Sequence, residues 1–396
     1  MGHVSMRDLA LIWHVHQPFF VPDAELEAQH VESYAPLLAL HRELDVPFTL
    51  NVCGGLLERL ATLAPGWVEA VREDATAGRV ELVASGKFHP MLPTMPHDRA
   101  RRQIEADVEA KRAILGARPR GFWPTDLGWA HWLVPLVAAQ GVDWVAVDSA
   151  AAVEGSVRPS WREERVRGHR VLAPDLSPLV AARELGLVHR LTFGDETVHA
   201  LLRHHALSWD LVDTQRGALH RPERIGAFVD AVGAHYDSGA DLLVLGDDGE
   251  RVRPRTLESY RACLEALSEA GVRFVLGSDA VDARRAGASE RYLPAGTSLV
   301  DFSAWTTTPD DHVCLRQLGE VQERFVRLSQ RAKASGAVEA TARLQAIDAA
   351  LLPCEDAALT FWKYLRRTRE PFLVRLHALR DLLDEAEAAL AACYGS

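Results

Sequence analysis

Cysteines are few in this sequence, and long apolar stretches are missing. The five cysteines, at positions 53, 263, 314, 354 and 393, form no Cys-x-x-Cys pair. Their spacing argues against a zinc site built from thiolates and against a disulfide framework. No basic stretch followed by an apolar segment opens the sequence, and no apolar run approaches the roughly 20 residues that cross a bilayer. We therefore expect a cytoplasmic protein.

Positive charge is also scarce, because 44 lysines and arginines face 55 aspartates and glutamates. The net charge of −11 argues against nucleic acid or an anionic membrane as a main partner and fits a neutral or cationic ligand. A length of 396 residues allows one large core, or a barrel with an appended domain. Apolar residues at 48% and charged residues at 25% are typical of a soluble globular protein.

Short apolar runs alternate with longer segments of helical periodicity. The expected strands cover residues 9–16, 48–53, 80–84, 121–123, 144–147, 242–245 and 274–276. The expected helices between them include residues 56–77, 97–115 and 255–270. Strands separated by helices are typical of βα units that surround a parallel sheet. The sequence therefore predicts an α/β fold.

Polar side chains follow four of the expected strands. The first strand runs into His14-Val15-His16, the third toward His89, the fourth into Trp123 and Asp126, and a later one into Asp248. Catalytic groups in such folds collect where strands end and βα loops begin. We therefore expect these four strand ends to deliver polar groups to the same rim.

Two parts of the chain depart from the alternating pattern. Residues 150–240 are harder to interpret, and residues 158–170 suggest a loop-rich insertion that Pro159 opens. Residues 313–332 and 371–392 are strongly helical and predict a helical region beside the barrel. We expect a barrel in residues 1–290 and a mainly helical region in residues 291–396.

His14 and His16 lie two residues apart on a strand, so their side chains point to the same face. A single histidine at such a position is as readily a hydrogen-bonded core residue as a functional one. A pair on one face of a strand that Gln17-Pro18 ends favours a site. The two imidazoles are suited to sugar hydroxyls and also to a metal ion, because His-x-His is a metal-ligand arrangement in other barrel hydrolases.

Two acidic positions are candidates for catalysis. Asp126 follows an apolar strand, with the alternative that it caps a helix beginning near Ala130. Asp248 lies in Asp247-Asp248-Gly249-Glu250, with the alternative that Asp-Gly is only a turn. Three carboxylates within four residues repel one another, which tends to raise the pKa of at least one. Glycoside hydrolysis needs two carboxyl groups beside the scissile bond, and Asp126 and Asp248 are the natural pair.

An ordered series of segments resembles glycoside hydrolase family 57, the family of 4-α-glucanotransferases, α-amylase-like enzymes and some branching enzymes. The segments are HVHQP at 14–18, GRVELVASGKFHPMLPTMP at 78–96, GFWPTDLGW at 121–129, LGDDGERV at 245–252, RYLPAGTSLVDFSAW at 291–305 and, more weakly, LLPCEDAALTFWKYLRR at 351–367. The resemblance spans roughly residues 7–390 and implies an incomplete (β/α)7 barrel with a helical C-terminal region. It also implies retaining chemistry on α-glucans without a metal or other cofactor.

The resemblance also assigns roles to residues of this chain. Asp248 falls on the family's acid/base position, and Asp126 falls on the position of its nucleophile. The substrate-binding candidates that lie in the matching segments are His14, His16, His89, Trp123, Trp129, Glu250, Trp305, Asp356 and Trp362.

The sequence departs from the family at two of these segments. The family nucleophile is a glutamate, and the aspartate at 126 is one methylene shorter, so its carboxylate retreats by roughly 1–1.5 Å on an unchanged backbone. Such a misplacement can lower a rate about a hundredfold. Asp126 either still acts as nucleophile, or leaves room for water and inversion, or lies in a protein that binds sugar without cleaving it. Lys363 follows Trp362 where the family usually has histidine.

Three functions therefore stay open. The first is a glycoside hydrolase or transglycosylase that acts on α-glucans or short α-glycosides through Asp126 and Asp248. The second is a catalytically weakened homologue that binds carbohydrate. The third is a metal-dependent hydrolase that uses His14, His16 and an aspartate. The expected partner is an oligo- or polysaccharide, not nucleic acid or a membrane.

Overall fold

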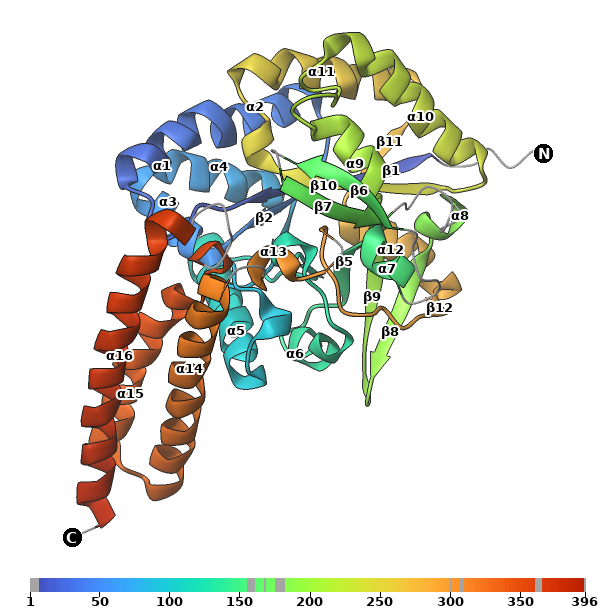
Figure 1. Cartoon of the computed structure of the whole chain (residues 1–396). Coiled ribbons are helices and arrows are strands. Elements are labelled where there is room, and N and C mark those ends of the chain that lie inside the picture. Colours follow the sequence, from blue (N-terminus) through green and yellow to red (C-terminus); the bar gives the residue numbers. More distant parts are fainter. Residues whose placement is uncertain are drawn as a thin grey trace.

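The computed structural model describes residues 7–154, 161–166, 169–174, 182–299, 301–306, 309–359 and 365–394. A curled, mostly parallel sheet lies at its centre, helices cover the outside of the sheet, and a bundle of three long helices projects from one side (Figure 1). Among the described residues, no helix is both long enough and apolar enough to span a membrane.

Seven parallel strands form the curled sheet, in the order β10-β1-β2-β3-β4-β5-β9. They are β1 (Asp8–Val15), β2 (Phe48–Val52), β3 (Val80–Ala84), β4 (Gly121–Phe122), β5 (Trp144–Asp148), β9 (Glu196–Arg203) and β10 (Leu242–Asp248). At the seam between β9 and β10, the described residues form no strand ladder, and the His204 N–H donates to the Val244 carbonyl at 2.8 Å. The expected incomplete (β/α)7 barrel is confirmed.

Further strands flank the ring. The short strand β11 (Arg273–Val275) pairs with the first residues of β1, whereas β8 (Val188–Phe193) runs antiparallel to β9, and β12 (Ser289–Glu290) adds to β8. An antiparallel hairpin of β6 (Trp161–Val166) and β7 (His169–Pro174) lies where a loop-rich insertion was expected, so that expectation was wrong. The sequence does not reveal this hairpin, because the four consecutive charged residues Arg162 to Arg165 interrupt the apolar–polar alternation that is typical of a strand.

The helices agree with the predicted periodicity, with one interruption. The segment expected as one helix over 56–77 is two, because Ala64 leaves the helical region (φ −139°, ψ 56°) and Pro65 has no N–H to continue the ladder. The helices are α1 (Asp23–Gln29), α2 (Ala35–Leu44), α3 (Gly54–Leu63), α4 (Pro65–Thr76), α5 (His97–Leu115), α6 (Val134–Ala138), α7 (Ser149–Glu154), α8 (Ala182–Leu185), α9 (His205–Val212), α10 (Ile225–Asp237), α11 (Pro254–Glu269), α12 (Gly277–Arg284), α13 (Ser303–Thr306), α14 (Pro309–Ser335), α15 (Val338–Leu351) and α16 (Leu365–Tyr394).

Strand β1 shows how the core positions the site. Leu9, Leu11, Trp13 and Val15 pack outward against the helices, whereas Ala10 and Ile12 pack inside the ring. Side chains alternate along a strand, so His14 continues the inward row of Ala10 and Ile12, and His16 follows it just past the strand end. The alternation therefore places both imidazoles at the carboxyl end of the barrel.

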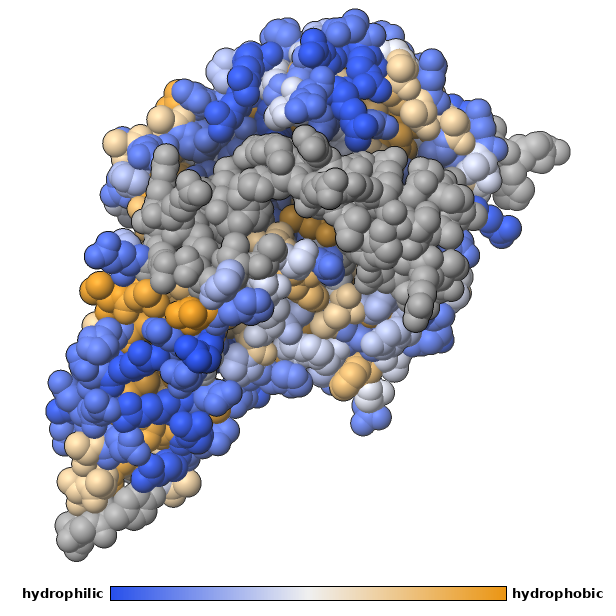
Figure 2. Space-filling view, viewed as in Figure 1, coloured by the Kyte–Doolittle hydropathy of each residue, from blue (hydrophilic) through white to orange (hydrophobic). Residues whose placement is uncertain are grey.

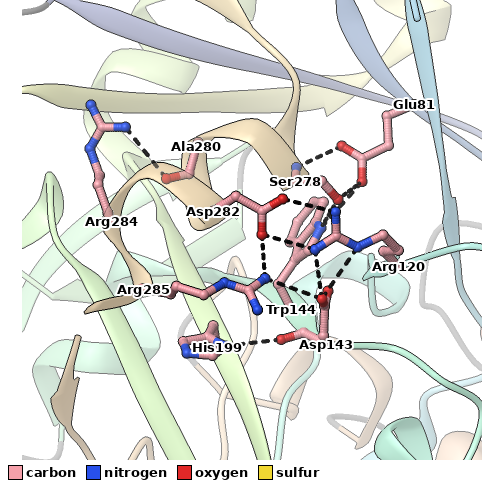
Figure 3. Close-up of polar contacts among 10 residues, drawn as sticks. All are labelled: Glu81, Arg120, Asp143, Trp144, His199, Ser278, Ala280, Asp282, Arg284 and Arg285. Atoms are coloured by element: carbon pink, nitrogen blue, oxygen red, sulfur yellow. Dashed lines mark hydrogen bonds and ion pairs between the residues drawn. The ribbon is translucent and has the colours of Figure 1, made fainter. Parts of the chain in front are cut away.

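The amino end of the barrel is closed by a polar network around Trp144 (Figure 3). The Trp144 ring occupies space that Gly121 and Gly277 leave free, because a Cβ added at either glycine would lie 2.2 Å or 2.4 Å from that ring. Partly buried Glu81 accepts the Ser278 N–H at 2.8 Å and the Trp144 indole N–H at 3.2 Å. The network joins β3, β5 and α12 below the core.

The bundle of α14, α15 and α16 has its own apolar core, to which Phe325, Leu344 and Leu376 contribute. Its surface is mainly hydrophilic along its length, and hydrophobic residues gather where the bundle meets the barrel (Figure 2). A buried ion pair ties it to α5: Arg99 donates to Glu355 at 2.7 Å, and Gln103 donates to the same carboxylate at 2.7 Å. This pair fixes the segment that carries the neighbouring Asp356.

Candidate active site

Four strand ends meet at the carboxyl rim of the barrel, as expected. The rings of His16, His89, His14 and Trp123 form a near-parallel stack, with centroids 4.1 Å apart for His16 and His89, 4.8 Å for His14 and His89, and 6.1 Å for His14 and Trp123. The stack therefore joins the ends of β1, β3 and β4.

A chain of hydrogen bonds fixes the tautomers in this stack. The amide group of Asn51 donates to the Val83 and Ala84 carbonyls, so its oxygen accepts from His14 Nδ1 at 2.8 Å. His14 Nε2 then accepts from His89 Nε2 at 3.0 Å, which leaves the lone pair of His89 on Nδ1. Burial lowers the pKa of His14 to about 3, and burial with the charge on His16 lowers the pKa of His89 well below its usual value. Both rings are thus neutral.

His16 differs from its two neighbours because it faces a carboxylate. Its Nε2 lies 3.6 Å from an Asp356 oxygen, and both side chains are almost fully buried. Burial favours the neutral ring, but the charge on Asp356 outweighs it and raises the pKa of His16 to about 10. At neutral pH the site therefore holds one imidazolium beside two neutral imidazoles.

Asp126 lies on a strained turn directly after β4. Asp126 and Leu127 both have positive φ, at 46° and 56°, a conformation that aspartate tolerates better than most residues because its side chain is short and polar. The Asp126 carbonyl accepts the Ser298 N–H at 3.0 Å, so the segment around residue 298 supports the turn. The alternative that Asp126 caps a helix was wrong, because the next helical turn begins at His131 with Ala130 as its cap.

Burial and the nearby Asp248 carboxylate raise the pKa of Asp126 to about 7. Asp248 ends β10 and is exposed, and its side chain makes no capping hydrogen bond to the turn that follows. Within the part of the chain that the structure describes, neither carboxylate has a cationic partner in an ion pair. Asp126 and Asp248 therefore form an electrostatically coupled pair at one rim.

The other two carboxylates of the acidic cluster are held by donors. Glu250 accepts from Tyr34 at 2.5 Å, from the His16 backbone at 3.2 Å and from Gln17 at 3.3 Å. Burial and the charge on Asp248 raise the pKa of Glu250 to about 7, and the same causes raise the pKa of Asp247. The prediction that crowding raises the pKa of at least one carboxyl group is confirmed.

A short π-helix (His30–Tyr34) positions one of these donors, Tyr34, and also Ser33. The extra residue in its turn lets Ser33 and Tyr34 face the loop after β10, where Ser33 donates to the Gly249 carbonyl at 2.7 Å. Glu250 thus connects β1 and the π-helix to β10 instead of pointing freely to solvent.

Arg203, at the end of β9, bridges the open seam of the barrel. Its buried guanidinium donates to Asp148 at 2.6 Å, to Asp247 at 2.9 Å and to the Gly246 carbonyl at 2.5 Å. His205 donates to the same Asp148 carboxylate at 3.0 Å. Burial opposes ionisation of Asp148, but His205 and Arg203 outweigh it and lower its pKa to about 2.

The C-terminal region contributes Asp356 and Trp305. The Ala357 N–H donates to the His89 carbonyl at 3.0 Å, which holds the residue after Asp356 against the histidine stack. Buried Trp305 packs with Met91 and Ala357. Trp129 is fully buried and pairs through its backbone with Gly296, so its ring lies in the core. Trp362 lies outside the described residues.

Several buried polar atoms at this rim have no hydrogen-bond partner among the described residues. They are both ring nitrogens of His16, one oxygen of Asp356 and the indole nitrogen of Trp123. Orphaned polar groups are costly in a core and are frequent where a ligand binds. The rim is therefore a candidate site for a polar ligand.

Four further residues of this site were not predicted from the sequence: Asn51, Tyr34, Arg203 and Asp148. Arg203 could have been found, because the short apolar run Ala200 to Leu202 is followed by Arg-His-His, like the other strand ends. The sequence pattern does not indicate that Tyr34 belongs to the site, because its contact with Glu250 depends on the π-helix.

Comparisons with known proteins identify a family and several relatives. The model of glycosyl hydrolase family 57 matches residues 10–287. A 4-alpha-glucanotransferase from Thermococcus kodakarensis is 26% identical over 257 residues, which cover 62% of this chain and 39% of that protein. Alpha-amylase 1 from Dictyoglomus thermophilum is 30% identical over 138 residues, 35% of this chain and 20% of that protein. The matches thus span well under half of these relatives.

Solved structures share the fold over nearly the whole chain. A family 57 branching enzyme from Thermococcus kodakaraensis superposes with a TM-score of 0.70 at 15% identity, covering 96% of this chain and 94% of that one. An exo-type maltose-forming amylase from Pyrococcus sp. ST04 gives a TM-score of 0.71 at 11% identity, covering 99% and 82%. At these identities the likeness concerns the fold.

Proposed function

Because this chain belongs to glycosyl hydrolase family 57, we propose that it cleaves or transfers α-glucans or short α-glycosides, with Asp126 and Asp248 as its two catalytic carboxyl groups. The observation that carries the proposal is the electrostatic coupling of these two groups at the carboxyl rim. A family relative that matches 62% of this chain is a 4-alpha-glucanotransferase, which supports the substrate class.

We assign Asp248 as acid/base and Asp126 as nucleophile. The charge on Asp248 is the largest electrostatic cause of the raised Asp126 pKa, so the charges of the two groups are coupled. The form with one proton on the pair is the form that a two-carboxylate mechanism uses, with one group donating to the leaving oxygen and the other attacking. The imidazolium of His16 also lowers the pKa of Asp126 and supports the ionised nucleophile.

The proposed sugar contacts are the orphaned atoms of His16, Asp356 and Trp123, with His14 and His89 holding them in place. Sugar hydroxyls both donate and accept, so they suit a cationic ring, a carboxylate and an indole N–H in one small site. Asp356 comes from the helical region, and we propose that residues 291–396 complete the site of a barrel formed by residues 1–290.

A second candidate is a homologue that binds carbohydrate with little turnover. The observation that favours it is the short side chain of Asp126 on a left-handed turn, where the family has the longer glutamate. Replacing Asp126 by glutamate separates the two candidates, because it restores the reach of the carboxylate.

The deciding experiment measures turnover of maltooligosaccharides and aryl α-glycosides by wild type, Asp126→Glu and Asp126→Asn in parallel. The proposal expects turnover by wild type that Asp126→Asn abolishes. Binding of maltooligosaccharides without turnover by wild type, with turnover gained in Asp126→Glu, supports the second candidate. If wild type turns over substrate and Asp126→Asn is equally active, the assignment of Asp126 as nucleophile is wrong.

A further inference from the structure

Helix α5 carries a row of buried polar side chains behind the rim. Arg99, Gln103, Asp107 and Lys111 follow one another at intervals of four residues, which brings them toward one face of the helix, and all four are at most 2% exposed. Polar groups are costly to bury unless each one finds a partner. A surface helix usually turns apolar residues toward the core, so this row indicates a function beyond packing.

The loop after β3, which ends at His89, is fastened to this row. The Ser85 N–H donates to the Asp107 carboxylate at 2.8 Å. The Phe88 N–H donates to the side-chain oxygen of Gln103 at 3.1 Å. His89 itself has a positive φ of 54°, a conformation that a residue with a side chain keeps only where its surroundings impose it. The row therefore holds the backbone from which the His89 ring enters the stack.

The nitrogen of the Gln103 amide group faces the helical region. It donates to the Glu355 carboxylate at 2.7 Å and to the backbone carbonyl three residues earlier at 2.8 Å, so both of its N–H bonds are used. Glu355 directly precedes Asp356, as Phe88 directly precedes His89. One fully buried amide group thus connects the residues that precede two members of the rim.

We propose that Gln103 is a positioning residue of this site, which sets the place of His89 relative to Asp356 through its amide group. The inference rests on the proposed function, in which Asp356 contacts the sugar and His89 holds the neighbouring rings. His16 contacts both residues, because its ring centroid lies 4.1 Å from that of His89 and its Nε2 lies 3.6 Å from Asp356. A shift of either segment therefore changes the arrangement that His16 and Asp356 offer to a sugar hydroxyl.

Gln322 on α14 offers a matched control. It is buried as Gln103 is, and its amide group donates to the same Glu355 carboxylate at 2.9 Å. Within the described part of the chain, no hydrogen bond joins the Gln322 side chain to the loop after β3. Replacing either glutamine by methionine keeps a similar side-chain volume and removes one donor from Glu355, but only Gln103→Met also leaves the Phe88 N–H without its acceptor.

Hydrogen exchange of the Ala357 amide tests the proposal without a substrate. This N–H donates to the His89 carbonyl at 3.0 Å, so its exchange rate reports whether the two segments stay together. We expect exchange at least about tenfold faster than in wild type for Gln103→Met, and within about threefold of wild type for Gln322→Met. On a glycoside that wild type turns over, we expect kcat/KM to fall by about 10–100-fold in Gln103→Met and by less than about threefold in Gln322→Met.

Ala357 exchange in Gln103→Met at the wild-type rate contradicts the proposal. An equal acceleration in the two variants also contradicts it, because the lost donor to Glu355 then explains the effect. Denaturant unfolding measures the global stability of each variant. If Gln103→Met does not fold, Gln103→Asn decides in its place, since its amide group is one methylene shorter and does not span both segments. A wild type that turns over no glycoside contradicts the proposed function and leaves the exchange result intact.

Discussion

The two ends of the barrel use the same residue types for opposite purposes. At the amino end, Arg120 lies between Asp143 at 2.8 Å and Asp282 at 3.0 Å, and Arg285 reaches both aspartates as well (Figure 3). At the carboxyl end, the negative charge of Asp248 acts on Asp126, and neither group forms an ion pair with a described residue. The amino end is arranged for stability and the carboxyl end for a ligand.

The pKa shifts follow this division. Arg120 lowers the pKa of Asp282, and the pKa of Asp8 is lowered by Arg273 and Arg284 although burial opposes it. Burial and like charge raise the pKa of Asp126 and Glu250 to about 7. Glu81 is the exception at the amino end, because it is buried among neutral donors and burial raises its pKa. Asp148 is the exception at the carboxyl end, because His205 and Arg203 lower its pKa to about 2.

The largest expected effect on turnover comes from removing one carboxylate at the carboxyl end, compared with removing one at the amino end. Asp248→Asn removes the proposed acid/base and lowers turnover by about 10²–10⁴-fold. Asp282→Asn removes a carboxylate from the amino end that is exposed, as Asp248 is, and it leaves turnover within about twofold of wild type. The turnover of both variants is measured as initial rates on whichever maltooligosaccharide or aryl α-glycoside wild type cleaves fastest. Equal losses in the two variants contradict the division between the ends.

Arg203 gives the next largest effect, because it holds the seam beside the acidic cluster. Arg203→Met leaves Asp148 and Asp247 without their buried cation, and the misplaced loop lowers turnover by about 10–100-fold. Arg203→Lys keeps the positive charge but loses the planar guanidinium that donates to several acceptors at once, so we expect turnover between that of Arg203→Met and wild type. The control is Arg120→Lys at the amino end, which alters thermal stability but not the pH profile of turnover. An unchanged pH profile in Arg203→Met contradicts the positioning role.

A third substitution is expected to destabilise the amino end of the barrel without affecting the carboxyl end. Gly277→Ala places a methyl group 2.4 Å from the rigid Trp144 ring, and such overpacking destabilises a core by about 1–3 kcal/mol. Denaturant unfolding measures the loss, and KM for the substrate stays unchanged. Gly226→Ala on α10 is the control, since nothing lies within 4 Å of its added Cβ. A changed KM with unchanged stability contradicts the assignment of this end to the scaffold.

Much of this fold could be predicted from local pattern. Strand β3 and helix α5 have the expected bounds, because apolar alternation and helical period are local properties. Strand β9 was missed, since it lies in the segment where the alternation was hard to interpret. The rim residues His14, His16, Asp126 and Asp248 were found because they follow apolar runs.

The partners of those residues could not be predicted, because they depend on tertiary contacts. Nothing in the sequence indicates that Asn51 fixes the tautomer of His14, or that Arg99 and Glu355 bring Asp356 against His16. These contacts join residues that are tens to hundreds of positions apart, which local periodicity does not encode.

The smallest expected effect concerns pH and stability. The folded protein binds the Asp126 proton more tightly than the unfolded chain, because its pKa is about 7 instead of 3.8. Stability from this group is therefore present at low pH and is lost as the pH rises through about 7. Asp126→Asn removes the titrating group, so we expect its melting temperature to exceed that of wild type at pH 8 by on the order of a few degrees, with a smaller difference at pH 5.

Asp8 at the amino end provides the opposite case. Its lowered pKa gives stability that is present above the unfolded value of 3.8 and is lost as the pH falls through that range. Asp8→Asn should therefore lower the melting temperature by the same amount at pH 5 and pH 8, because both values lie above that range. Melting curves of the three proteins at the two pH values test this. If the Asp126→Asn difference is as constant as that of Asp8→Asn, then Asp126 does not titrate near neutrality, and the two ends of the barrel do not differ in the way that their charges indicate.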